Sequence, residues 1–358
     1  MSQGLFTYLA LARRLAIEST NKSVGRQVME WCLLYLRSRL GPGFYNLGRM
    51  YQRDFPLFHL LGYWSSRQYA QRVYEWNERL YHRTSQNKIV EKAILSTYGV
   101  PTPELLGCFH PFRGLDREGR ELRSSRDLQR LLETLSPGEK VCFKLTEAWG
   151  GVGFHAAEYL GGDQLCFLDE DSPITVSELT ERLRVSGRDG VLVERYLEQH
   201  AEFAAFNPSS VNTLRCVVRQ VAEDRVECLL VFLRVGAAGS LVDNATSGGV
   251  IYPVDIERGV LLSGFMKAKP YELYTHNPVT GEQMQGRAVA FLEESIELAK
   301  SSLFAFPSIR FSGTDIAISR EGPLVLELNI FPDYGGFAYN QVPSRSVLPK
   351  LTANNRRQ

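Results

Sequence analysis

The stretch of residues 311–336 carries the clearest alternation of apolar and polar positions in the chain. It reads FSGTDIAISREGPLVLELNIFPDYGG, two alternating runs around a short turn, which is the pattern of a β-hairpin. Folding this hairpin about Glu321 sets Asp315 directly opposite Glu327, with the two side chains about 5 Å apart. Alternation predicts that Val325, Glu327 and Asn329 share a face. The opposite, core-facing side of the second run is then expected to hold Leu324, Leu326, Leu328 and Ile330.

The first 84 residues have a different pattern. Apolar positions at helical spacing predict helices over residues 5–17, 24–40 and 65–83, separated by an aromatic-rich connector. This segment contains no alternating β pattern. A helical cap packed on the rest of the protein is the commoner outcome for such helices, and contact with a membrane surface or a partner is the alternative.

From about residue 85 onward, helices and strands alternate, which predicts an α+β fold. Helices are expected over residues 88–98 and 126–135. The predicted strands are 141–145, 154–159, 190–197, 216–220 and 225–235, the last two pairing with each other. We divide the chain into a helical segment 1–84, a first lobe 85–190, a second lobe 191–350 and a disordered tail 351–358.

Length, charge balance and cysteine content limit the partners and the compartment that we expect for this protein. The chain has 358 residues, enough for two or three compact units, and its 41 Lys and Arg balance 40 Asp and Glu. This balance leaves no broad field for nucleic acid or an anionic membrane. The six cysteines are scattered without a C-x-x-C pair, which suits a reducing compartment. Residues 5–17 are too short and too interrupted for a signal peptide or a membrane span, so we expect a soluble, cytoplasmic protein.

The paired carboxylates of the hairpin need something that offsets their repulsion. Asp315, Glu327 and the amide oxygen of Asn329 are the kind of oxygen ligands that Mg²⁺ takes beside nucleotide phosphates. Solvent at a sheet edge or a buried ion-pair network are the alternatives. On the pattern alone, the metal site and these alternatives stay open.

A second candidate site follows the strand 141–145. Alternation places Lys144 on the face of Cys142, and the strand runs into the loop TEAWGGVG of residues 146–153. Its glycines allow backbone N–H groups to approach an anion, as in phosphate-binding nests. The loop matches neither the P-loop nor G-x-G-x-x-G, and a hairpin turn with three glycines would look the same.

Further polar candidates lie between these two regions. Arg215, Arg219 and Arg234 on the paired strands are able to bind phosphate or carboxylate, although a solvent-facing role is more expected for Arg219. The loops 242–253 and 275–286 are rich in small polar residues. Gly248 and Gly249 in the first loop form either a second anion nest or a simple turn.

In their order along the chain these motifs resemble the ATP-grasp superfamily. The ordered set is Lys88, Lys144, the glycine loop, LVERYL, SSVNTLR and the GTDIAI…LVLELN hairpin. The N-T-x-R, D-N followed by G-G, and H-x-P-x-T-G stretches resemble the sugar-transfer-associated ATP-grasp group in particular. The resemblance covers roughly residues 85–345 and implies two α+β lobes that grip ATP. This chain begins with helices, where many members of the superfamily begin with a Rossmann-like domain.

The resemblance also implies roles for individual residues. ATP phosphates would contact Lys88, Lys144 and the loop glycines Gly150, Gly151 and Gly153. The adenine hinge would be Glu194, Tyr196 and Leu197, with the ribose held by Glu202 or Glu198. Mg²⁺, or Mn²⁺, would be held by Asp315, Glu327 and Asn329, and charge in the reaction would be neutralised by Arg215 and Lys144. The second substrate is expected near Asn212, Asp243, Asn244, Gly248, Gly249 and His276.

Three classes of function agree with such a site. The first is a carboxylate–amine (or carboxylate–thiol) ligase that works through an acyl phosphate and releases ADP and phosphate. The second is a small-molecule kinase, and the third is a nucleotide-binding subunit without turnover. We favour the ligase, with small-molecule carboxylate and amine substrates related to polysaccharides or amino acids only by analogy. The sequence leaves the oligomeric state open, with a homo-oligomer as one outcome.

Overall fold

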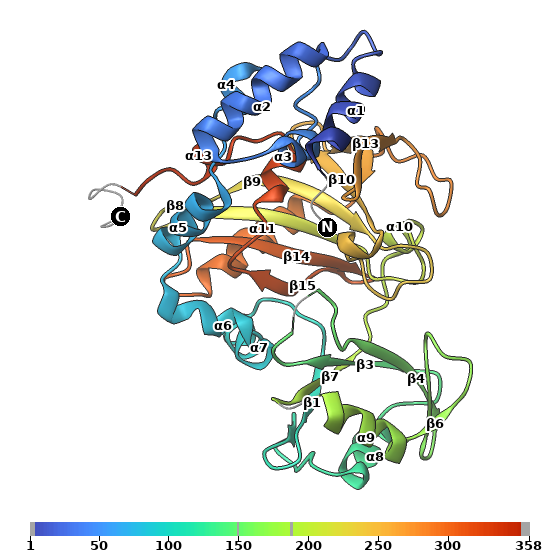
Figure 1. The fold of residues 1–358 in the computed structure, drawn as a ribbon. Helices are drawn as coiled ribbons and strands as arrows, with labels where there is room; N and C mark the ends of the chain where they lie inside the picture. Colours follow the sequence, from blue (N-terminus) through green and yellow to red (C-terminus); the bar gives the residue numbers. More distant parts are fainter. Residues whose placement is uncertain (1–3, 149, 187–188, 352–358) are drawn as a thin grey trace.

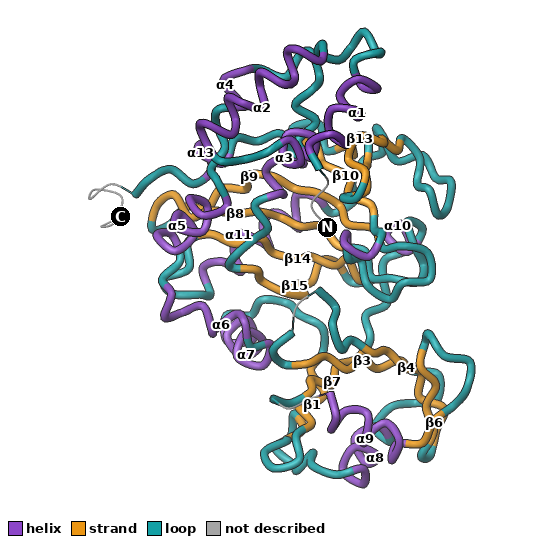
Figure 2. Tube along the Cα trace, in the orientation of Figure 1, coloured by secondary structure: helices purple, strands orange, loops and turns teal. Residues whose placement is uncertain are grey.

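The computed structural model describes residues 4–148, 150–186 and 189–351. Two antiparallel sheets dominate it, and the N-terminal helices lie at the far end of the molecule from the smaller sheet (Figure 1). Figure 2 shows the same arrangement by element type, with helices packed against both sheets. The tail expected to be disordered lies, from residue 352 on, outside the described residues.

The smaller sheet forms the first lobe together with two helices. Its seven strands follow the order β2-β1-β7-β3-β4-β5-β6. The strands are β1 (Leu105–Phe109), β2 (Leu115–Asp116), β3 (Lys140–Leu145), β4 (His155–Gly161), β5 (Gln164–Phe167), β6 (Ile174–Thr175) and β7 (Val191–Arg195). The helices α8 (Ser125–Leu132) and α9 (Val176–Ser186) pack on the face that carries Val141 and Phe143. Because β7 lies between β1 and β3, the lobe boundary expected after residue 190 is corrected to a position after β7.

The larger sheet forms the second lobe. Its strands follow the order β13-β12-β10-β9-β8-β14-β15, and β11 pairs with β10. The strands are β8 (Thr213–Ala222), β9 (Arg225–Val235), β10 (Val250–Asp255), β11 (Val260–Leu261), β12 (Gly264–Met266), β13 (Lys269–Tyr274), β14 (Phe311–Ser319) and β15 (Gly322–Asn329). The last two form the expected hairpin, and Asp315 pairs with Glu327 as predicted.

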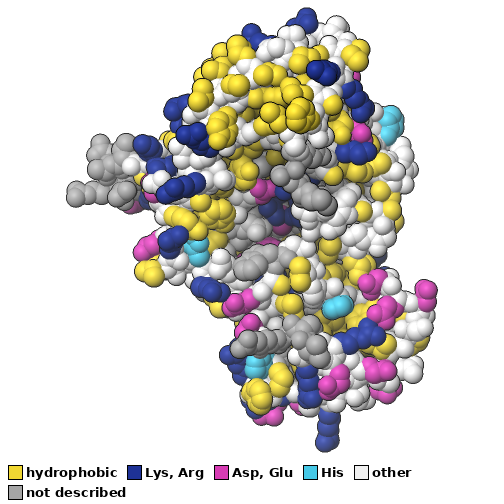
Figure 3. Space-filling model, viewed as in Figure 1, with side chains coloured by type: hydrophobic (Ala, Val, Ile, Leu, Met, Phe, Trp, Pro, Cys, Tyr) yellow, Lys and Arg dark blue, Asp and Glu magenta, His cyan; other side chains and the backbone are white. Residues whose placement is uncertain are grey.

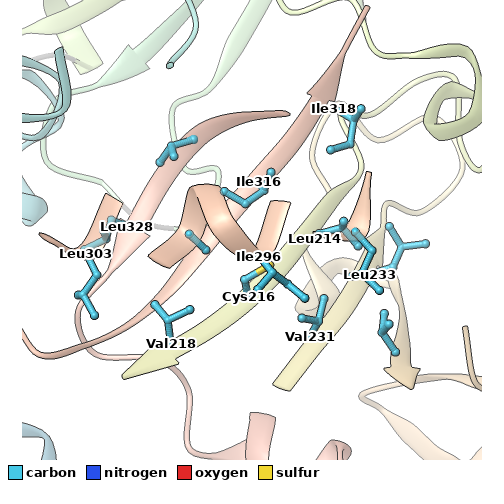
Figure 4. Packing of buried hydrophobic residues seen from close by; sticks show 14 of the residues in the cluster. Leu214, Cys216, Val218, Val231, Leu233, Ile296, Leu303, Ile316, Ile318 and Leu328 are labelled. Atoms are coloured by element: carbon cyan, nitrogen blue, oxygen red, sulfur yellow. The ribbon is translucent and has the colours of Figure 1, made fainter. Parts of the chain in front are cut away.

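The large sheet is buried on both faces, and alternation along its strands decides which side chain faces where. One face presents Leu214, Cys216 and Val218 of β8 to the helix α11 (Leu292–Phe304), as Figure 4 shows. The opposite face presents the residues in between, among them Arg215 and Val217. The polar residues of the site therefore all come from the second face.

The helical cap, residues 4–84, covers much of that second face. Its elements are α1 (Leu5–Leu15), α2 (Val24–Ser38), α3 (Pro42–Leu47), α4 (Leu57–Leu60), α5 (Ser66–Trp76), a 3-10 turn (Arg79–Tyr81) and the first part of α6 (His82–Gln86), which runs on past the cap. Tyr69 donates to the carbonyl of Pro332 at 2.7 Å, and the indole of Trp64 donates to the carbonyl of Leu348 at 3.1 Å. The helices are thus a packed cap, although apolar side chains also gather on their outer surface (Figure 3).

The helix predicted over residues 65–83 is broken at Asn77, and the structure explains why. Asn77 adopts an extended conformation (φ −118°, ψ 113°) after α5 ends at Trp76. Its amide donates to the carbonyls of Phe311 and Ile330 at 2.7 and 2.6 Å, so these tertiary bonds outweigh helix propensity. The hairpin is therefore tied to the cap at this residue.

The remaining helices connect the lobes or follow the hairpin. They are α7 (Lys88–Thr97), α10 (Ala201–Ala204), a 3-10 turn (Ala245–Ser247), α12 (Gly335–Tyr339) and α13 (Ser344–Val347). No helix within the described ranges combines the length and the apolar character needed to cross a bilayer.

Candidate active site between the two lobes

A cavity opens where the small sheet faces the second face of the large sheet. Its empty volume is about 1130 Å³, including its open mouth. On the small-lobe side, β3, the glycine loop and the end of β7 line it, and β8, β9, β14 and β15 line it on the other. Clefts of this size between lobes are typical binding sites for small molecules.

A buried ion-pair network forms the small-lobe wall. Glu194 of β7 is fully buried between two ammonium groups, Lys144 at 2.6 Å and Lys92 at 2.7 Å. Burial would raise the pKa of Glu194, but the two lysines lower it below its ordinary value. The same carboxylate raises the pKa of Lys144 despite burial. Glu194, which was expected in the adenine hinge, lines the cavity and fixes Lys144 at its wall as a cation.

The glycine loop and Lys88 complete this wall. Gly150 and Gly151 have φ of 66° and 78°, a left-handed conformation that glycine adopts without steric cost. Lys88 donates to the carbonyl of Ala148 at 2.5 Å, and Asn244 of the other lobe donates to the carbonyl of Gly150 at 3.0 Å. The loop is thus held closed against the second lobe.

Asp315 is the centre of the large-lobe wall. Arg215 binds its carboxylate with two nitrogens, the Nη2 contact at 2.6 Å, and Arg234 donates to its Oδ2 at 2.9 Å. Arg234 also pairs with Asp243 at 3.0 Å, and Thr213 donates to that second carboxylate. Burial alone would raise the pKa of Asp315, but the two guanidinium groups lower it.

Glu327 and Asn329 also face the cavity, without such partners. Among the described residues, neither side chain has a hydrogen bond or an ion pair. A β-bulge leaves Leu326 unpaired opposite the step from Asp315 to Ile316 and shifts the register of the β15 residues that precede it. Val325 therefore lies opposite Ile316 and packs in the core, while Leu326 lines the cavity. The faces predicted for Val325 and Leu326 were therefore wrong, while the position of Glu327 opposite Asp315 was right.

These three residues fit a divalent cation. Glu327 and Asn329 have free oxygens directed to the cavity, and Asp315 has an unused lone pair because its oxygens accept three hydrogen bonds out of about four possible. The described residues contain no group of three His, Cys, Asp or Glu side chains that could hold a metal. The candidate site is therefore two carboxylates with one amide, a set suited to Mg²⁺ with phosphate oxygens as further ligands.

Sequence reasoning assigned Lys88 to the site but missed the rest of α7. Its Glu91 is buried and accepts a hydrogen bond from the backbone N–H of Leu328 at 3.2 Å, directly between the two free ligands. Burial and the nearby Glu327 carboxylate raise the pKa of Glu91. Lys88, Glu91 and Lys92 occupy consecutive turns of one helix face, and this i, i+3, i+4 spacing is the signal that was available.

The residues expected around the adenine base line the cavity, whereas those expected around the ribose do not. Tyr196 and Leu197 line the cavity beside Lys144. Glu202 is exposed on α10 and does not line it, and Glu198 pairs with Arg320 at 3.0 Å outside it. Both expected ribose acids thus lie outside the cavity lining.

The expected substrate residues separate in the same way. Asp243 and Asn244 line the cavity. Asn212 is fully buried and bonds the carbonyls of Phe203 and Asn207 at 2.9 and 3.0 Å, so it holds a loop together. Asn212, Gly248, Gly249 and His276 all lie outside the cavity lining, and so does Gly153 of the expected phosphate loop.

A second chamber adjoins the cavity beneath the cap. Its empty volume is about 640 Å³, and it shares Arg215, Arg234 and Asn244 with the cavity. The apolar part of its lining comes from Val217, Leu230, Phe232, Ile251, Phe337 and Tyr339. An ion pair between Lys267 and Asp333, at 2.7 Å, lies at its edge. The predicted arginines thus stand at the junction of two spaces, whereas Arg219 binds the carbonyl of Val347 away from both.

Comparison with known proteins identifies the family. Residues 65–354 match the sequence model of the family described as sugar-transfer associated ATP-grasp. The chain belongs to this family. Enzymes of the ATP-grasp superfamily generally use ATP and divalent metal ions. No curated protein matches the sequence.

The solved structures that the chain matches are distant in sequence. An N5-carboxyaminoimidazole synthase from Aspergillus clavatus, solved with ADP and 5-aminoimadazole ribonucleotide, is 13% identical with a TM-score of 0.43, over 80% of this chain and 58% of its own. An L-amino acid ligase from Bacillus licheniformis is 13% identical with a TM-score of 0.41, over 76% and 50%. A D-alanine–D-alanine ligase from Coxiella burnetii is 12% identical with a TM-score of 0.37, over 70% and 49%. The chain thus spans only about half to three-fifths of the length of these proteins.

Proposed function

We propose that this protein is an ATP-dependent ligase that joins a small-molecule carboxylate to an amine or a thiol. The observation that carries the proposal is the cavity between the lobes, with lysines and a glycine loop on one wall and the unpartnered Glu327 and Asn329 on the other. Family membership supports the use of ATP.

On the small-lobe wall, Lys88 and Lys144 neutralise phosphate charge. Lys144 keeps its proton because the buried Glu194 carboxylate lies beside it. The backbone N–H groups at Gly150 and Gly151 contact the same phosphate. Tyr196 and Leu197, with their apolar surface, lie where a base would be held.

On the large-lobe wall, Asp315, Glu327 and Asn329 would hold the divalent cation. When bound, ATP with its metal supplies the phosphoryl group that activates a carboxylate as an acyl phosphate. Arg215 and Arg234 stand between the cavity and the second chamber, so they orient the substrate carboxylate and neutralise its charge.

The second chamber is the proposed site of the substrates. Part of its wall is apolar and aromatic, so it fits a molecule with an apolar part whose carboxylate reaches Arg215. The amine or thiol then attacks the acyl carbon, the C–O bond to phosphate breaks, and inorganic phosphate leaves with ADP. In this reaction the protein positions groups and neutralises charge, and no nucleophilic side chain is needed.

The test is a product assay over a panel of carboxylates and amines. We expect ADP and inorganic phosphate to appear in equal amounts and only when both substrates are present. Glu327→Gln, with the same panel, should abolish both. Formation of a stable phosphorylated product at full rate without an amine or thiol would contradict the ligase and make the protein a kinase.

A further inference from the structure

The near neutrality of the chain conceals a segregation of charge. Residues 1–84 contain twelve Lys and Arg against five Asp and Glu, while the remaining residues contain 29 against 35. The helical cap thus has an excess of seven positive charges and the rest an excess of six negative charges. Such an asymmetry directs one end of the molecule to an anionic surface.

The helix α2 of the cap presents an apolar stripe to solvent. Met29, Cys32, Leu33 and Leu36 lie at i, i+3, i+4 and i+7, on one face of the helix. Met29 is 45% and Leu36 is 74% exposed. The opposite face of the same helix buries Glu30, whose carboxylate pairs with Lys22 at 3.0 Å. The buried face also holds Trp31 and Leu34, so this helix carries apolar residues on its exposed face as well as on its buried face.

Neighbouring helices of the cap add to this surface. Phe6 of α1 is 87% exposed and Phe58 of α4 is 71% exposed. Figure 3 shows apolar side chains gathered over α1, α2 and α4, with Lys and Arg around the margin. Exposed basic residues of the cap include Arg13 and Arg37. Single exposed apolar residues are common on proteins, but a gathered group with a polar margin marks an interaction site.

We propose that the cap docks on an anionic lipid bilayer. The apolar stripe of α2 and the exposed phenylalanines enter the boundary between headgroups and acyl chains, and the surrounding arginines bind headgroup phosphates. An apolar face flanked by arginines is the pattern of helices that lie in the membrane interface. A protein partner would be favoured by an apolar surface alone, whereas nine exposed arginines against three exposed acids in the cap favour a polyanionic surface.

The test is sedimentation of the full chain with lipid vesicles. We expect binding to vesicles of equal parts phosphatidylcholine and phosphatidylglycerol, weaker binding to phosphatidylcholine alone, and weaker binding as salt is raised. Met29→Ser/Leu36→Ser should weaken binding about tenfold or more. Arg13→Gln/Arg37→Gln should weaken it about fivefold for each arginine.

The controls separate this surface from general stickiness. Phe112→Ser removes an apolar side chain that is 83% exposed on the small lobe, and this variant should bind as the wild type does. All four side chains changed in the two cap variants are exposed, so their Tm should remain that of the wild type. Absence of binding to the mixed vesicles would overturn the proposal. So would a dimer in sedimentation velocity that Met29→Ser/Leu36→Ser dissociates, because a second copy would then cover the stripe.

Discussion

The two walls of the cavity are both built from buried ion pairs, but their charges have opposite sign. On the small-lobe wall three cations accompany one acid, namely Lys88, Lys92, Lys144 and Glu194. On the large-lobe wall two cations accompany three acids, namely Arg215, Arg234, Asp243, Asp315 and Glu327. One wall is therefore electropositive and the other retains an unneutralised carboxylate.

This difference shows how one cavity could serve two ligands of opposite charge. In a site of low dielectric constant, the lysine wall favours phosphate and the acidic wall favours a cation, and each interaction is stronger than it would be in water. The two walls also differ in whether a carboxylate is left without a partner. Both oxygens of Glu194 form ion pairs with lysines, whereas Glu327 has no partner among the described residues and remains free for a ligand.

The largest effect is expected for the free acid. Glu327→Gln keeps the shape of the side chain but removes the charge of a ligand, and we expect ADP release to fall by roughly 10³-fold. Stability should hardly change, because Glu327 makes no ion pair in the described structure. ADP release and Tm, measured on the same preparation, check both parts.

Glu321→Gln is the matched control for this change. Glu321 lies in the turn of the same hairpin, outside the cavity, and its loss should leave activity unchanged. Turnover by Glu327→Gln at the wild-type rate would remove the metal assignment.

Replacement of Glu194, the buried acid of the small-lobe wall, is expected to lower stability, whereas replacement of Glu327 lowers activity. Glu194→Gln leaves Lys92 and Lys144 without their counter-charge, and we expect a loss of about 3–5 kcal/mol in the free energy of unfolding. Lys144→Ala is the comparison, since Glu194 then keeps Lys92, and it should weaken ATP binding with a smaller loss of stability. Urea denaturation and calorimetry of ATP binding measure the two effects. Equal stability of wild type and Glu194→Gln would mean that the network does not support the wall.

The ion pairs of Glu194 with its two lysines also predict how the stability of the protein depends on pH. The pKa of Glu194 is lowered in the folded protein relative to its ordinary value of 4.5. The stabilisation is therefore present above the unfolded pKa and is lost as pH falls through the lower, folded pKa. The difference in unfolding free energy between wild type and Glu194→Gln should stay constant from neutral pH to about 5 and narrow below about 4.5. If this difference in unfolding free energy instead widened in acid, the pKa of Glu194 would be raised in the folded protein and not lowered.

Sequence reasoning found the acidic wall more completely than the lysine wall. The pairing of Asp315 with Glu327 followed from a period of two along adjacent strands, and only the bulge at Leu326 escaped it. The contact of Glu194 with Lys92 joins residues far apart in the chain on two separate elements, and no local pattern reports it. The helical cap was predicted as helices, but the break at Asn77 depends on bonds to a hairpin more than 200 residues away.

A smaller effect is expected at the glycine loop. Gly151 has a φ of 78°, and a Cβ there would lie 3.0 Å from Val242, so Gly151→Val strains the backbone and pushes the loop from the second lobe. We expect ATP affinity to fall about tenfold. Gly162→Val is the control, because Gly162 also has positive φ but open space around it. Unchanged affinity in Gly151→Val would leave the loop as an ordinary turn.

The last prediction sharpens the comparison, because it concerns the helix that joins the walls. Helix α7 supplies Lys88 and Lys92 to one wall, and its Glu91 accepts the backbone N–H of Leu328 on the other. Glu91→Ala leaves that N–H without a partner, and we expect a cost of about 1–3 kcal/mol in unfolding free energy. It should also raise the Mg²⁺ concentration needed for half-maximal activity.

Glu91→Gln retains an acceptor oxygen for Leu328, so it should restore most of both properties. This rescue distinguishes a residue that positions Glu327 and Asn329 from one that merely fills space, because a space-filling role would not change the Mg²⁺ requirement. If Glu91→Ala kept the wild-type requirement for Mg²⁺, the hairpin would hold its ligands without α7, and the two walls would be independent of each other.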